Sequence, residues 1–269
     1  MRRLIIPGTG LETSRFIFGT SSLMRVGSEK ARRRLLAAAV EHGFLHFDTA
    51  PYYGFGVAER DLAPILKANP ALRVTTKVGI YSPGGEEQAA TSVLMRKVGG
   101  KVFPSLARPT TSFDLNRAKR CLTGSLRRLG REHIDLYMLH EPELHLLVAG
   151  EWLEWLEWLE GLRSKGTIGF YGLALTATRL QPFLSSGSAL AQVTQVLDTL
   201  KGREGDVLAL HKRALQITYG YISGARAVGD DSPVSELLRL AAKRNAHGPI
   251  IVSTKRVDRM AQYARLEEA

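Results

Sequence analysis

Short apolar runs alternate with amphipathic segments along almost the whole of this sequence. The first run, at 16–20, precedes a segment at 29–42 whose apolar residues recur at helical spacing. The alternation continues to the end of the chain and predicts eight strand–helix pairs. The predicted strands are 16–20, 45–49, 74–78, 134–140, 168–173, 192–197, 215–219 and 250–253.

Strict alternation of strands and helices favours a parallel sheet, because each crossover helix returns the chain to the same end of the sheet. Eight pairs in 269 residues match the size of a closed (β/α)8 barrel. A Rossmann fold is disfavoured, because no Gly-x-Gly-x-x-Gly segment follows the first predicted strand. We therefore predict an α/β protein with one domain, a (β/α)8 TIM barrel over residues 1–269, with a long loop at about 80–112.

The chain is basic, with 37 Lys and Arg against 26 Asp and Glu and a net charge of +11. Such a surplus suits binding to a polyanion, which releases counterions from phosphates. The basic residues are spread over the whole chain, however, and form no basic tail. We therefore expect no specific nucleic-acid partner, and we assign the charge to a solvated surface or to a site for a small phosphorylated ligand.

Cysteine content and hydropathy limit the disulfides, metal sites and membrane spans that we expect in this protein. Cys121 is the single cysteine, which excludes an intramolecular disulfide and a Cys-rich zinc site, and we expect no metal. No apolar stretch approaches the roughly 18 residues of a membrane span. The expectation is a cytoplasmic protein without membrane contact, either a monomer or a weak homo-oligomer.

Ionisable residues end successive predicted strands, where a barrel of this type places its chemistry. Lys77 ends an apolar strand and is costly to bury unless an anion pairs with it, so Asp48 is its natural partner. A tyrosine beside this lysine would have a lowered pKa and could exchange a proton near neutral pH, with His140 sharing the transfer or orienting the substrate. The alternative is that Asp48–Lys77 is only a structural ion pair and His140 a buried histidine with satisfied hydrogen bonds.

The segment 43–59 reads Gly-Phe-Leu-His-Phe-Asp-Thr-Ala-Pro-Tyr-Tyr-Gly-Phe-Gly-Val-Ala-Glu and resembles the first signature of the aldo-keto reductase family. The resemblance extends from residues 7–11 to the last predicted helix. It implies a catalytic tetrad of Asp48, Tyr53, Lys77 and His140, with Tyr53 as general acid/base. It also implies hydride transfer between NAD(P)H and a small-molecule substrate, namely an aldehyde, a ketone or a sugar.

The same resemblance implies a set of cofactor-binding residues. Gln195 matches the glutamine that binds the nicotinamide carboxamide, and Tyr219 matches the aromatic residue that stacks on the nicotinamide ring. The segment at the end of the last strand resembles the site for the adenosine 2′-phosphate, which favours NADP over NAD. The full set is Gly19, Thr20, Gln195, Tyr219, Ser253, Thr254, Lys255 and Arg259.

One segment departs from the family pattern. After the fifth strand the family usually reads Gly-Val-Ser-Asn, whereas this chain has Gly172, Leu173, Ala174 and Leu175. Both polar side chains that normally hold the carboxamide are absent. The departure motivates an alternative function, that of a catalytically weak, nucleotide-binding regulatory or sensing protein of the same fold.

Overall fold

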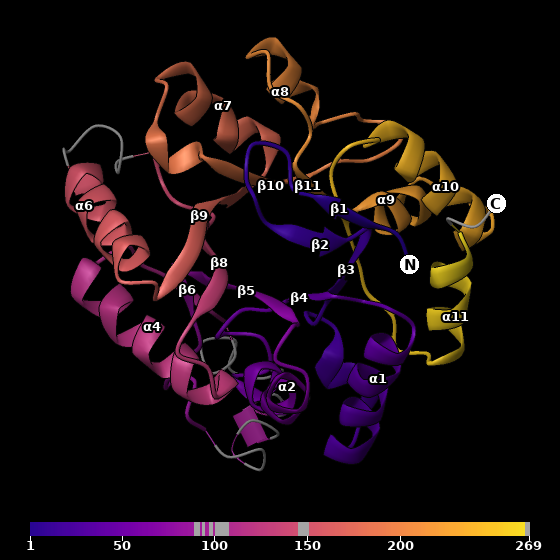
Figure 1. Cartoon of the computed structure of the whole chain (residues 1–269), viewed down its shortest axis with the longest axis horizontal. Helices are drawn as coiled ribbons and strands as arrows, with labels where there is room; N and C mark the ends of the chain where they lie inside the picture. The colour runs from indigo at the N-terminus through magenta and orange to yellow at the C-terminus, as the bar shows by residue number, and fades with distance from the viewer. Residues whose placement is uncertain (89–91, 93–94, 97–98, 100–107, 145–150, 267–269) are drawn as a thin grey trace.

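A closed barrel of parallel strands forms the centre of the computed structural model (Figure 1). The strands follow one another around the barrel in the order of the sequence, and the last pairs with the first, Ile251 opposite Ile17. The predicted (β/α)8 barrel is therefore confirmed. The barrel strands are β3 (Phe16–Gly19), β4 (His46–Asp48), β5 (Arg73–Val78), β8 (Ile134–His140), β9 (Ile168–Leu175), β10 (Val193–Leu197), β11 (Ile217–Tyr219) and β12 (Ile250–Val252).

The structure describes most of the chain, including every one of these barrel strands. The described residues are all those of 1–269 except 89–91, 93–94, 97–98, 100–107, 145–150 and 267–269.

Helices surround the barrel on its outside (Figure 1). Their starts follow local signals: Ser28 accepts a hydrogen bond from the Ala31 amide, and Asp114 accepts one from the Arg117 amide. One short helix, α9, was not predicted, because seven residues are too few to display a helical period. The helices are α1 (Glu29–Glu41), α2 (Val57–Ala68), α4 (Leu115–Leu129), α6 (Glu151–Ser164), α7 (Ala177–Ser185), α8 (Asp206–Leu210), α9 (Tyr221–Ala227), α10 (Val234–Arg244) and α11 (Asp258–Arg265).

An N-terminal hairpin, which the sequence did not reveal, closes the end of the barrel where the strands begin. It consists of β1 (Arg3–Ile5) and β2 (Glu12–Ser14) and lies across the barrel in Figure 1. The Gln216 side chain, just before β11, donates a 2.7 Å hydrogen bond to the Pro7 carbonyl of the hairpin turn. The hairpin thereby seals the apolar interior of the barrel from water.

Two apolar layers stabilise the barrel. The larger lies between strands and helices, and a smaller cluster fills the barrel interior. The interior cluster consists of Ile6, Leu11, Ile17, Leu136, Met138, Ala174, Val193 and Ile217.

The connection between β5 and α4 contains the segment that was predicted as a long loop at about 80–112. Its two ends pair as a short antiparallel ribbon, β6 (Ile80–Tyr81) with β7 (Thr110–Thr111). Much of what lies between these strands is outside the described residues.

His46 lies fully buried at the start of β4. Its Nδ1 is 3.0 Å from Thr13 Oγ1, and its Nε2 is 2.8 Å from Thr75 Oγ1. Burial lowers the pKa of His46 to about 4, although the charge of Asp135 opposes the shift. The folded protein therefore holds a neutral imidazole that bridges the hairpin and the barrel.

We predict that this histidine makes the fold less stable in acid. The unfolded chain protonates His46 near its ordinary pKa of 6.5, whereas the folded chain resists protonation until about 4. The contribution is therefore complete above pH 6.5 and is lost as the pH falls towards 4, by roughly 3 kcal/mol in all. Urea unfolding across this pH range, compared between wild type and His46→Gln, measures the difference. An equally steep loss in His46→Gln would contradict the assignment.

Candidate active site

Asp48 and Lys77 form a buried ion pair at the end of the barrel where the strands finish. Lys77 Nζ lies 2.6 and 2.7 Å from the two Asp48 carboxylate oxygens, and 3.0 Å from the Thr49 carbonyl oxygen. Burial raises the pKa of Asp48 and lowers the pKa of Lys77, and each partner's charge opposes the shift of the other. The predicted pairing of Lys77 with Asp48 is confirmed.

Three aromatic rings gather beside this pair. Lys77 Nζ is 5.3 Å from the centre of the Tyr53 ring, and the Tyr53 and His140 rings are 6.4 Å apart. The Tyr52 ring packs against both, with its centre 4.8 Å from that of Tyr53 and 5.6 Å from that of His140. The structure thus brings together all four residues of the predicted tetrad. Tyr52 was not among the predicted residues, although its position next to Tyr53 in the sequence was a usable signal.

The predicted lowering of the Tyr53 pKa is wrong. Burial raises the pKa of Tyr53 well above its ordinary value, and the negative charge of Asp48 raises it further. Lys77 does not reverse this shift, because its charge is already paired with the Asp48 carboxylate. Tyr53 therefore keeps its proton at neutral pH and can act as a hydrogen-bond donor or an acid.

His140, the last residue of β8, is neutral. Burial lowers its pKa well below the ordinary value, and the Lys77 charge lowers it further. Its Nδ1 atom is buried without a hydrogen-bond partner in the described part of the chain. The alternative of a buried histidine with satisfied hydrogen bonds therefore fails at this atom.

His140, Ala174 and Gln195 are register neighbours on three adjacent strands. Ala174 on β9 lies opposite both His140 on β8 and Gln195 on β10. Gln195 is buried, and its Oε1 atom has no hydrogen-bond partner among the residues that the structure describes. Ala174 offers only a methyl group, and Leu175 is buried in the layer between strands and helices. A buried acceptor without a partner is costly, which points to a donor from a ligand at this position.

Gly19 and Thr20 contact the backbone of Asp48, one member of the ion pair. Gly19 pairs with Asp48 across β3 and β4. The Thr20 hydroxyl donates to Thr49 Oγ1 at 2.9 Å and lies 3.1 Å from the Asp48 carbonyl oxygen. Thr20 therefore supports the backbone that carries Asp48.

Tyr219 ends β11 and is partly buried. Burial raises its pKa, and the negative charges of Glu141 and Asp48 raise it further. The residues that follow it, at the start of α9, border a cleft of about 190 Å³ between α9, α10 and β12. The cleft is lined by Gly220, Tyr221, Ile222, Ser223, Leu238, Ile250, Ile251, Val252 and Ser253.

The predicted phosphate-binding residues lie where the last strand leads into α11. Ser253 borders the cleft, and Lys255 is exposed. Burial raises the pKa of the Tyr263 hydroxyl, and Arg259 and Thr254 oppose this shift. Arg256, in contrast, pairs with Asp258 at 3.0 Å.

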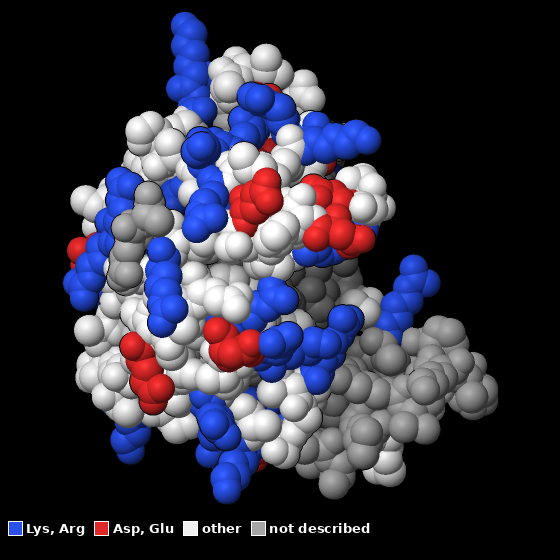
Figure 2. Space-filling model, turned by 90° about the vertical axis from the view of Figure 1, so that its right-hand side faces the viewer, with Lys and Arg blue, Asp and Glu red and all other residues white. Residues whose placement is uncertain are grey.

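Basic side chains are spread over the face that includes α10 and α11 (Figure 2). Acidic side chains are interspersed among them, which fits the expectation of a solvated basic surface.

The described residues show no group of three or more His, Cys, Asp or Glu side chains that could hold a metal ion. Within the same part of the chain, no helix has both the length and the apolar character needed to cross a membrane.

We predict that the Asp48–Lys77 pair must be kept or removed as a unit. Asp48→Asn leaves the Lys77 ammonium buried without a counter-charge and should lower the free energy of unfolding by about 3–5 kcal/mol. The double variant Asp48→Leu, Lys77→Met removes both charges and should recover much of that loss. Chemical denaturation measures both effects. If the single variant is as stable as wild type, the pair does not have this energetic role.

Two curated relatives match about half of this chain. D-threo-aldose 1-dehydrogenase from a Pseudomonas species is 30% identical over 145 residues, which are 53% of this chain and 42% of that protein. 6-dehydroglucose reductase from Agrobacterium fabrum is 28% identical over 142 residues, which are 49% of this chain and 41% of that protein. The matched regions thus span about two fifths of the length of these relatives.

Solved structures and a family model match more of the chain. A glycerol dehydrogenase from Gluconobacter oxydans superposes with a TM-score of 0.73 over 98% of this chain and 89% of that chain, at 18% identity. The holo form of an aldo-keto reductase from Bacillus halodurans gives a TM-score of 0.73 over 100% and 91%, at 19% identity. These likenesses show the fold. The model of the aldo/keto reductase family matches residues 15–197, and the chain belongs to that family.

Proposed function

We propose that this protein is an NADP-dependent oxidoreductase that transfers a hydride between the nicotinamide and a carbonyl or alcohol substrate. The observation that carries the proposal is the buried Asp48–Lys77 pair with the rings of Tyr53 and His140 beside it. Family membership is consistent with this chemistry.

Each member of this cluster has a role that follows from its protonation state. Tyr53 keeps its proton, so it can donate it to the carbonyl oxygen of the substrate during reduction. The Lys77 ammonium near its ring, although paired with Asp48, would then offset part of the cost of the phenolate that remains. His140 is neutral and would orient the carbonyl by hydrogen bonding. The reduced nicotinamide, when bound, supplies the hydride.

The residues that would hold the cofactor follow from unpaired atoms and the cleft. Gln195 Oε1 is a buried acceptor in need of a donor, which the carboxamide NH₂ would supply. Tyr219 would stack on the nicotinamide ring, and the cleft between α9, α10 and β12 would take the phosphates. Thr254, Lys255 and Arg259 would bind the 2′-phosphate, which favours NADP over NAD.

The substrate class is proposed from the relatives. Their names specify an aldose and a dehydroglucose, which are polyhydroxylated carbonyl compounds or their hemiacetals. We propose a small aldehyde, ketone or sugar as the substrate of this chain.

Removing the Tyr53 hydroxyl should abolish most of the activity. Tyr53→Phe is expected to lower kcat by about 10²–10⁴-fold, the contribution of a general acid, while NADPH affinity changes little. Consumption of NADPH over a panel of aldehydes and sugars measures kcat, and fluorescence titration measures affinity. Equal turnover by wild type and Tyr53→Phe would overturn the catalytic assignment.

Arg259 should select NADPH over NADH. Arg259→Met is expected to raise KM for NADPH about tenfold through loss of a charge-assisted bond to phosphate, and to leave KM for NADH unchanged. Arg256→Met is the matched control, because Arg256 is paired with Asp258. An equal change of KM for the two cofactors would contradict a role in 2′-phosphate binding.

A second candidate function is a nucleotide-binding regulatory or sensing protein of the same fold. The observation that favours it is the replacement of two polar side chains by Ala174 and Leu175, both buried. Calorimetry would distinguish the two functions, because a sensing protein would bind NADPH without turning over any carbonyl compound in the panel.

A further inference from the structure

We propose that Asp198 and Tyr221 are positioning residues for the nicotinamide site, because they fix the turn that carries Tyr219. The inference rests on the proposed function, in which Tyr219 stacks on the nicotinamide ring. It concerns a polar network behind the site rather than residues that touch the cofactor ring.

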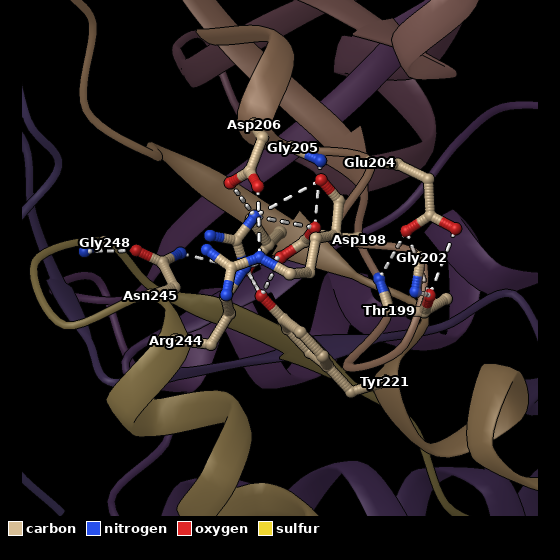
Figure 3. Close-up of polar contacts among 12 residues, drawn as sticks. Asp198, Thr199, Gly202, Glu204, Gly205, Asp206, Tyr221, Arg244, Asn245 and Gly248 are labelled. Carbon is tan, nitrogen blue, oxygen red and sulfur yellow. Dashed lines mark hydrogen bonds and ion pairs between the residues drawn. The ribbon is translucent and has the colours of Figure 1, made fainter. Parts of the chain in front are cut away.

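Asp198 follows β10 directly and is completely buried. The Tyr221 hydroxyl donates a 2.6 Å hydrogen bond to Asp198 Oδ2, and the Gly205 amide donates a 2.9 Å bond to Oδ1 (Figure 3). Both carboxylate oxygens therefore have donors from separate elements of the fold.

Arg244 supplies the opposite charge. It lies at the end of α10, and its Nε and Nη2 atoms donate to the two Asp198 oxygens at 3.1 and 3.3 Å (Figure 3). Its Nη2 also lies 2.6 Å from Asp206 Oδ1, at the start of α8. A buried carboxylate is tolerated when it is paired and fully hydrogen-bonded, as this one is.

Asp198 holds the residues on both sides of Gly220. Its backbone amide donates a 2.8 Å hydrogen bond to the Tyr219 carbonyl, and its carboxylate accepts from Tyr221. Gly220 has a φ of +103°, and a Cβ atom added there would lie 2.3 Å from Leu197 Cδ1. The turn is therefore packed directly against the end of β10.

This geometry gives Tyr221 a defined task. Tyr221 lines the cleft between α9, α10 and β12, and its hydroxyl connects the cleft wall to Asp198 by a hydrogen bond. Tyr219 lies two residues earlier on the same turn. Loss of the tie would release the backbone that sets the Tyr219 ring, and stacking depends on the position of that ring.

The test compares two tyrosine–carboxylate hydrogen bonds of equal length. Tyr221→Phe removes the bond to Asp198, and Tyr171→Phe removes the 2.6 Å bond from Tyr171 to Glu160, far from the proposed site at the other end of the barrel. Both variants keep the ring and its packing. Two probes are titrated, NADPH and adenosine 2′,5′-bisphosphate, which carries the 2′-phosphate but no nicotinamide.

Tyr221→Phe is expected to weaken NADPH binding about tenfold and to reduce the change in nicotinamide fluorescence on binding. Binding of the bisphosphate should stay within about twofold, and Tyr171→Phe should resemble wild type with both probes.

Three results would overturn the inference. Wild-type NADPH affinity in Tyr221→Phe would show that the tie does not position the ring. An equal loss for NADPH and the bisphosphate would indicate general loosening of the fold. Failure of the wild-type protein itself to bind NADPH would overturn the proposed function and this inference with it.

Discussion

The ion pair between Asp48 and Lys77 organises the polar end of the barrel. Two adjacent strands bury opposite charges 2.6 Å apart, and the Thr49 carbonyl takes a further Lys77 hydrogen. The field of this pair acts on every titratable ring around it, raising the pKa of Tyr53 through Asp48 and lowering that of His140 through Lys77. Burial reinforces each shift, since it raises the pKa of Tyr53 and lowers the pKa of His140. Both rings are therefore neutral at physiological pH.

The buried Asp198 network differs from two side chains of the candidate site in whether its polar atoms have partners. Asp198 is buried with a donor at each oxygen, and its network links β10, α8, α9 and α10. Gln195 Oε1 and His140 Nδ1 are buried without partners in the described part of the chain. Because an unpaired buried polar atom costs free energy, fully paired networks suit scaffolding, and unpaired atoms suit the recognition of a ligand.

The sequence showed much of the fold because its signals are local. The alternation of apolar runs with amphipathic segments indicates strands and helices. Asp114 indicates the start of α4, because its side chain accepts a hydrogen bond from the amide of Arg117, three residues later. Strand ends in a parallel barrel share one edge, so the meeting of Asp48, Lys77 and His140 also followed from local assignments. The β1–β2 hairpin and α9 escaped notice because three-residue strands and a seven-residue helix are too short to display a period.

By itself, the sequence determined the barrel, the edge where its polar residues meet and the partner of Lys77, because each depends on residue type and spacing. Only the tertiary structure decided the protonation of Tyr53, since that depends on burial and on whether the Lys77 charge is already paired. The ion pair between Asp198 and Arg244 also depends on the tertiary structure. It joins residues 46 positions apart, and no local pattern encodes a contact over that separation.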